Sequence, residues 1–153
     1  MGNHLPFAEL LTLYSLTIAT VSQNGQPHAA AVYFVNDNQL NFYFISKPDS
    51  QHCLDLAANL LAAISISSPL SNWQNINGLQ MRGKITEIVS IQQKLKAETL
   101  YQEKFPFVKT LQNEVAKNRW YVFSPEWLRW IDNRIHFGHK QEWFGNELIQ
   151  LYE

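Results

Sequence analysis

The stretch Leu79-Gln-Met-Arg-Gly-Lys-Ile-Thr86 is the most regular in the chain, and it decides the fold class. Apolar or small residues occupy every second position, and polar residues occupy the positions between them. A period of two is that of a β-strand with one face in a core and the other face outside it. The stretch therefore predicts a strand of a mainly β domain.

The sequence before this stretch predicts three more strands with turns between them. Asn24-Gly25 is a strong hairpin signal, and Asn36-Asp-Asn38 predicts a second turn. The strands expected around these turns are Leu16–Ser22, His28–Val35 and Leu40–Ser46. Their order predicts a three-stranded meander whose last strand has residues 40, 42 and 44 on one face.

The remaining segments predict helices alternating with strands. Helical spacing or caps predict helices over 7–14, from Asp49 or Ser50 to about 61, from Ser90 to about Lys104, and a shorter one after Phe105-Pro-Phe107 to Ala116. Strands are expected at Leu60–Ser67, which looks buried, at Arg119–Ser124 and at Trp127–Ile135, with a polar loop over Pro69–Asn77. The sum is one domain over 1–153, mainly β (α+β): a six- to seven-stranded antiparallel barrel with peripheral helices.

Composition excludes several classes of protein. The 153 residues carry a net charge of −1, and the 12 Lys and Arg residues are scattered, so we expect no nucleic-acid partner. A single cysteine, Cys53, excludes an internal disulfide. No signal peptide and no apolar stretch of roughly 20 residues is visible, so we expect a cytoplasmic protein without a membrane partner.

No familiar catalytic or metal motif occurs in the chain. The five histidines are dispersed, so no metal site is predicted, and Cys53 falls on a helix face that indicates core packing rather than nucleophilic catalysis. Five Trp, six Tyr and nine Phe exceed what a small barrel can bury. We expect some of these rings in a subunit interface or in a pocket for a flat ligand.

The segment Ser46-Lys-Pro-Asp-Ser-Gln-His52 is the candidate binding site. It connects the end of a predicted strand to the start of a predicted helix, where unpaired N–H groups and the helix dipole attract anions. Two hydroxyls, an ammonium and an imidazole are suited to phosphate oxygens. The alternative is that Ser50 or Asp49 only caps the helix while Lys47 and His52 face water.

Several motifs, in this order and spacing, resemble the pyridoxamine 5'-phosphate oxidase superfamily of FMN-binding split barrels. They cover nearly the whole chain, and the later ones resemble its small YhbP-like branch. They are Gly25-Gln-Pro27, Phe42–Ser46 with Ser50-Gln-His52 and the helix to Asn59, Leu79–Gly83, Phe105-Pro106, Ile131-Asp-Asn133 and Phe137–Lys140.

The resemblance implies FMN as cofactor and assigns roles to individual residues. Ser46 and Ser50 match the hydroxyls that contact the phosphate, and Gln80 matches the glutamine that faces the flavin ring. Gln51 and His52 stand where the oxidases carry Arg and Lys, so Lys47 and a protonated His52 would have to replace part of the lost charge. Losing the arginine would weaken FMN binding by about 10- to 150-fold, the value of one charge-assisted hydrogen bond.

Three tryptophans and a short C-terminal motif complete the set of candidates. Trp73, Trp120 and Trp130 could stack on the flavin ring or could serve core and dimer packing. Arg134-Ile-His136 resembles the substrate-binding Arg-x-His of the oxidases, and Lys140 could reach the pocket or face solvent.

The resemblance implies a homodimer with the cofactor site at the subunit interface, acting as an FMN-dependent oxidoreductase on an unknown small-molecule substrate. No residue stands out as catalytic. Two alternatives remain: a non-enzymatic flavin-binding or ligand-free module for sensing or interaction, and a haem-binding split barrel in which no histidine is singled out as axial ligand.

Overall fold

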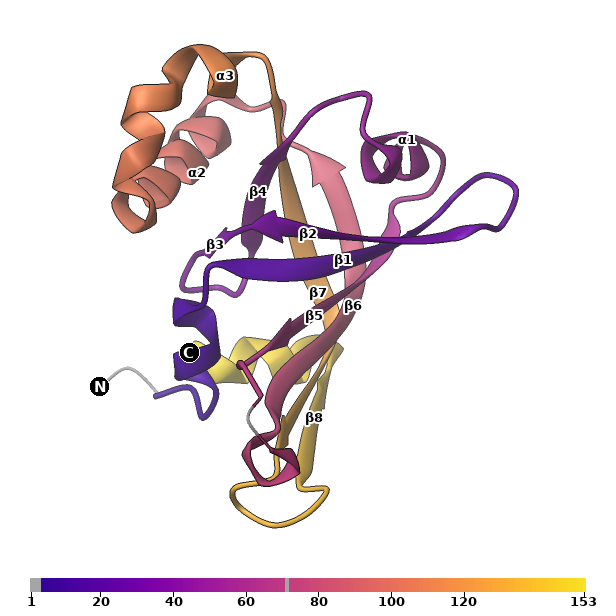
Figure 1. The fold of residues 1–153 in the computed structure, drawn as a ribbon, viewed down its shortest axis with the longest axis vertical. Helices are drawn as coiled ribbons and strands as arrows, with labels where there is room; N and C mark the ends of the chain where they lie inside the picture. The colour runs from indigo at the N-terminus through magenta and orange to yellow at the C-terminus, as the bar shows by residue number, and fades with distance from the viewer. Residues whose placement is uncertain (1–3, 71) are drawn as a thin grey trace.

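The computed structural model describes residues 4–70 and 72–153, and within them eight strands form one antiparallel sheet (Figure 1). Neighbouring strands follow the order β2-β1-β5-β6-β7-β4-β3. β4 pairs with residues 119–123 of β7, and β8 pairs with residues 127–131 of the same strand. The sheet curls into a half-barrel, which confirms the predicted fold class. Two of its strands were not predicted from the sequence: β3, which has two residues, and β8. The strands are β1 Ser15–Val21, β2 Pro27–Tyr33, β3 Val35–Asn36, β4 Phe42–Ser46, β5 Leu61–Ser67, β6 Asn77–Glu87, β7 Arg119–Asp132 and β8 Lys140–Phe144.

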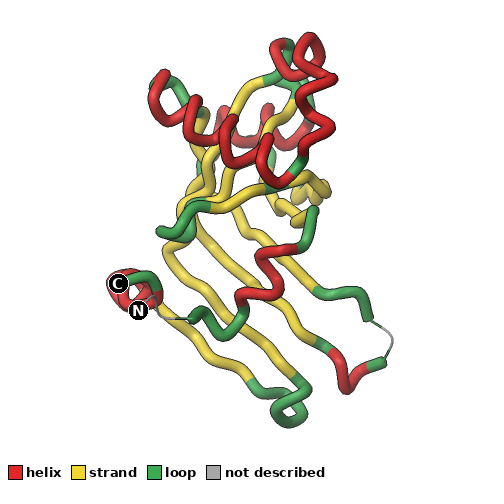
Figure 2. The backbone as a smooth tube through the Cα atoms, turned by 90° about the vertical axis from the view of Figure 1, so that its left-hand side faces the viewer, coloured by secondary structure: helices red, strands yellow, loops and turns green. Residues whose placement is uncertain are grey.

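The helices lie at the periphery of the sheet (Figures 1 and 2). The α-helices are α1 Gln51–Ala58, α2 Ile91–Lys104 and α3 Gln112–Ala116, and the 3-10 helices are η1 Ala8–Thr12, η2 Trp73–Asn75, η3 Pro106–Leu111 and η4 Gly145–Leu151. The Ser90 hydroxyl caps α2 by accepting a hydrogen bond from the Gln93 amide, as the sequence predicts. In Figure 1, α2 and α3 lie together beside β4, and α1 lies beside the β1–β2 hairpin.

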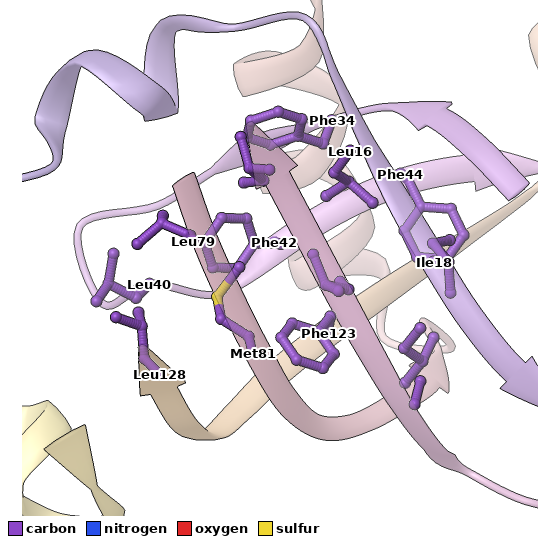
Figure 3. Close-up of a cluster of buried hydrophobic side chains, with 14 of the residues drawn as sticks. Leu16, Ile18, Phe34, Leu40, Phe42, Phe44, Leu79, Met81, Phe123 and Leu128 are labelled. Atoms are coloured by element: carbon purple, nitrogen blue, oxygen red, sulfur yellow. The ribbon is translucent and has the colours of Figure 1, made fainter. Parts of the chain in front are cut away.

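Two apolar clusters hold the elements together, and β4 contributes to both. Figure 3 shows the larger cluster, in which Phe42 and Phe44 of β4 lie among side chains of β1, β6 and β7. Tyr43, on the opposite face of β4, belongs to the second cluster, which packs beneath α2, and Ile45 packs against it. The predicted alternation of faces in this strand is therefore correct.

The predicted meander is wrong at its third strand. β4 pairs with β3 and β7, and no ladder among the described residues joins it to β2. The reason is that β4 is apolar on both faces and needs a partner that is also buried on both faces; the segment 120–123 of β7 satisfies this. β5 also differs from its prediction, because one of its faces is exposed: Leu61 is 55% exposed while Ile64 is buried.

The two strands expected after residue 119 are one continuous strand, β7. The pairing of β6 with β7 shifts register between Arg82 and Gly83, which lies opposite Pro125. A proline donates no ladder hydrogen bond and is accommodated at such an irregularity. At Gly83 a Cβ atom would lie 2.1 Å from the carbonyl oxygen of Ser124, so the two strands approach each other too closely for any side chain.

Candidate functional site

Three predicted site residues converge where β4 meets α1. Ser46 is the last residue of β4 and Ser50 is the residue before α1. The Nε2 atom of His52 lies 2.5 Å from Ser46 Oγ and 3.2 Å from Ser50 Oγ, and the two hydroxyl oxygens are 3.4 Å apart. We call this group of Ser46, Ser50 and His52 the anion corner.

The backbone around Ser50 leaves the start of α1 open to a ligand. Ser50 does not cap the helix with its side chain; its hydroxyl donates to the carbonyl oxygen of Lys47 at 2.8 Å. The Ser50 amide bonds the same carbonyl at 3.1 Å, which closes a tight turn before the helix. The N–H groups of the first turn and the positive end of the helix dipole therefore remain available to an anion beside the three side chains.

Two other residues of the predicted segment do not join this group. Lys47 is exposed in the loop between β4 and α1. Gln51, where the oxidases carry Arg, turns away, and its Nε2 donates to Asp55 Oδ1 at 2.8 Å. The corner thus combines two hydroxyls with one imidazole, and its only group able to carry a positive charge is His52.

Asp55 is the centre of a second polar group, which the sequence did not indicate. Its side chain is 1% exposed. Besides Gln51, it accepts a hydrogen bond from Thr20 Oγ1 at 2.7 Å, and His28 Nδ1 lies 2.8 Å from Oδ2. Thr20 and His28 are directly paired across β1 and β2, so one carboxylate ties α1 to both strands. We call these four residues the Asp55 hub.

The charge state of Asp55 follows from these bonds. Burial opposes ionisation, yet the hydrogen bonds from Thr20, Gln51 and His28 outweigh it and hold the pKa of the carboxyl below its usual value. Asp55 is therefore an anion near neutral pH, with all three neighbours directed at it.

Cys53 is buried in the main core cluster, as the helix pattern predicted. Burial alone would raise the pKa of its thiol, but hydrogen bonding with His52, Ser50 and Tyr121 lowers it to about 7. Burial and the hydrogen bond with Cys53 raise the pKa of Tyr121. The thiol thus lies directly beneath the anion corner.

A groove runs along the outer face of the sheet, over β1, β5, β6 and β7. It consists of two adjoining hollows of about 570 and 340 Å3 that share Ala19, Ala63, Arg82 and Trp127 as lining residues. Gln80 lines the smaller hollow, and its side-chain oxygen accepts a hydrogen bond from Arg129 Nη1 at 3.3 Å. We call this the outer groove.

Trp127 is the aromatic residue of the outer groove, and the sequence did not single it out. The guanidinium carbons of Arg82 and Arg129 lie 4.6 and 4.8 Å from the centre of its ring. The period-two pattern predicted that Arg82 faces outward. The floor made by Ala19 and Ala63 depends on strand pairing between distant segments, and no local signal could have found it.

The tryptophans that the sequence proposed lie elsewhere. Trp73 is exposed in η2, with its ring edge-on to Phe137 at 5.6 Å. Trp120 is 3% exposed, packs edge-on against Tyr101 at 5.3 Å and lines a separate cavity of about 250 Å3 between α2 and α3. Trp130 is buried and donates its Nε1–H to Asn77 at 3.0 Å. Trp120 and Trp130 have the core packing that the sequence left open as an alternative, whereas Trp73 lies at the surface.

Arg134 serves the fold in this structure. Its guanidinium pairs with Asp132 and with Glu9, which joins the loop after β7 to η1. Lys140 is exposed at the start of β8. Over residues 4–70 and 72–153, no group of three or more potential metal ligands is found, and no helix is long and apolar enough to cross a membrane.

Comparisons with known proteins give the family of this architecture. Residues 7–130 match the family model described as pyridoxamine 5'-phosphate oxidase. A UPF0306 protein of Enterobacter sp. (strain 638) is 25% identical over 119 residues, which is 78% of this chain and 80% of that protein.

Two solved structures share the fold at low sequence identity. A haem-binding protein from Mycobacterium smegmatis has a TM-score of 0.75 at 15% identity, over 94% of this chain and 57% of that one. The haem storage protein HutZ from Vibrio cholerae has a TM-score of 0.69 at 14% identity, over 92% and 94% of the two chains. These likenesses concern the fold alone.

Proposed function

The chain belongs to the pyridoxamine 5'-phosphate oxidase family, and we propose that it binds FMN with the flavin phosphate in the anion corner. The observation that carries this proposal is the convergence of Ser46 Oγ, Ser50 Oγ and His52 Nε2 within 3.4 Å of one another at the open start of α1. The Ser46 hydroxyl, the Ser50 hydroxyl once it turns from the Lys47 carbonyl oxygen to the phosphate, an imidazole that can be protonated and unpaired helix amides together suit a phosphate dianion.

We assign the flavin ring to the outer groove. Its small floor residues, Ala19 and Ala63, leave room for a flat ring, and Gln80 offers an amide at its edge. When bound, FMN supplies hydride-transfer chemistry. The chain's own part is to hold the phosphate, orient the ring with Gln80 and Arg82, and exclude water around it. The substrate is then a small molecule that stacks on the ring, and the protein is a flavin-dependent oxidoreductase.

The groove also supports a homodimer. Leu61 and Phe144, which line it, are 55% and 52% exposed, and both are large apolar side chains. A second copy of the chain would cover this surface and enclose the ring between two protomers.

The test of the proposed function is a titration of purified protein with FMN, followed by quenching of flavin fluorescence. Wild type should bind saturably, and Ser50→Ala should bind about tenfold more weakly, because one hydrogen bond to a charged group is lost. Ser124→Ala is the matched control, because this exposed serine contacts Asn41 near the other end of β4. Wild type that shows no saturable binding would refute the proposal.

The same preparation separates the alternatives. Two flavin absorption bands support FMN, and a sharp Soret band supports the haem-binding alternative, which rests on the names of structural relatives. None of the described histidines lines the outer groove, so a haem placed there would have no imidazole ligand from the same protomer. Reoxidation of the bound, reduced flavin by a panel of acceptors distinguishes an enzyme from a flavin carrier.

Binding of FMN and dimerisation should be thermodynamically linked. If two protomers enclose the ring, dilution of the loaded protein below the dimer dissociation constant releases flavin, and saturating FMN shifts the dimer equilibrium towards association. Sedimentation with flavin absorbance as the detection signal measures both quantities at once. A monomer that retains its flavin would contradict an interface site.

A further inference from the structure

We propose that Asp55 is the positioning residue of the anion corner: its hydrogen bonds to Thr20 of β1 and His28 of β2 set the rotation of α1 about its axis and thereby aim His52 at Ser46. This inference rests on the proposed function, since it explains how the chain builds the phosphate site. Asp55 itself does not touch the corner, because its described hydrogen bonds all go to the other members of the hub.

The arrangement of side chains around α1 gives the hub this role. Successive residues of an α-helix are rotated by about 100°, so His52 projects between Asp55 on one side and Leu56 and Cys53 on the other. Asp55, Leu56 and Cys53 are buried, whereas Leu54, on the opposite side, is 55% exposed. The helix is therefore held at both edges of its buried face, by a polar anchor and by an apolar one, with His52 between them.

The helix needs these anchors because it is short. Eight residues are too few for a stable isolated helix, so tertiary contacts must fix its orientation. Apolar packing of Leu56 is non-directional and tolerates small rotations. The hydrogen bonds of Asp55 to Thr20 and His28, at 2.7 and 2.8 Å, join the helix to two paired strands and are directional, so they resist such rotations.

Both oxygens of the Asp55 carboxylate are hydrogen-bonded. Thr20 and His28 approach one carboxylate oxygen, and Gln51 donates to the other. An amide in place of the carboxylate has the same size but replaces one acceptor with a donor. The bonds from Thr20 and His28 are then made to a neutral amide, and the bond to Gln51 is kept only if the Gln51 amide turns over, so the edge of the helix that carries Asp55 is held more weakly.

The experiment compares Asp55→Asn with Asp37→Asn, with FMN and inorganic phosphate as separate probes. Asp37 is a matched control because it is also a buried carboxylate, bonded to Tyr43 and Lys96, and it lies in the turn between β3 and β4 rather than at α1. Both variants should melt at lower temperature than wild type. Only Asp55→Asn should weaken binding of both probes, by about tenfold when measured well below its melting temperature, because misplaced contacts lose most of their value.

Phosphorus NMR of bound FMN gives a readout that a merely structural role would not change. The resonance should shift in Asp55→Asn and keep its position in Asp37→Asn. If Asp55→Asn does not fold, Thr20→Val removes one donor at nearly constant volume and should weaken binding about threefold.

The outcomes separate the two proposals. Equal affinities of wild type and Asp55→Asn, or equal losses in both Asp variants, would overturn the positioning role while leaving FMN binding intact. Wild type that binds phosphate but not FMN would refute the proposed function, and the phosphate arm would still decide the role of Asp55. Wild type that binds neither probe overturns both.

Discussion

Replacing Gly83 with alanine is expected to destabilise the fold by more than about 3 kcal/mol, the range of overpacking at a site that cannot relax. The new Cβ atom would lie 2.1 Å from the Ser124 carbonyl oxygen and 3.0 Å from Pro125 Cα, and both are backbone atoms. No side chain can move aside to relieve this contact. The central pair of strands would have to separate where β6 and β7 change register.

Urea unfolding followed by circular dichroism measures this effect, and Gly25→Ala is the control. Gly25 has φ of +84° in the β1–β2 turn, and no heavy atom lies within 4 Å of the position that an alanine Cβ would take, so only backbone strain of about 1–2 kcal/mol is expected there. A loss at Gly83 no larger than at Gly25 would mean that β6 and β7 lie farther apart than described. Arg82, which lines the outer groove, directly precedes Gly83 in β6, so separation of the strands should also abolish flavin binding.

Replacing His52 with glutamine is expected to weaken FMN binding by about 10- to 150-fold at pH 6, the value of a charge-assisted hydrogen bond. Gln51 is turned towards Asp55 and Lys47 is exposed, so the imidazole is the only donor of the anion corner that is able to carry a positive charge. A free imidazole gains its proton near pH ~6.5, and a bound phosphate favours the protonated form. Wild type should therefore bind FMN more tightly at pH 6 than at pH 8.

Dissociation constants measured from pH 5.5 to 8.5, roughly one unit or more to each side of the imidazole transition, test this prediction. The phosphate of FMN itself loses a proton near pH ~6, which favours binding at higher pH, so the His52→Gln profile supplies the baseline to subtract. His136→Gln, at an exposed histidine in the loop after β7, should retain the wild-type profile. Identical profiles in wild type and His52→Gln would remove His52 from the phosphate site.

Local patterns determined much of this protein. The period of two in β6, the Asn24-Gly25 hairpin and the Ser90 cap are each set by near neighbours, so they could be predicted from the chain alone. The approach of Ser46, Ser50 and His52 was also within reach, because one strand end and the first turn of the next helix lie within seven residues.

Strand pairing between distant segments decided the rest. β4 pairs with β7 rather than β2, and the two-sided burial that selects this partner exists only once both clusters form. The outer groove needs β1, β5, β6 and β7 side by side, and Trp127 became a groove residue only through that order, while Trp120 went beneath α2. Gln51 shows the limit most directly: the resemblance implied a position at the phosphate, but its side chain donates to the Asp55 carboxylate, which is bonded to β1 and β2. Local sequence encodes which groups are present at the corner, and long-range packing fixes which of them converge there.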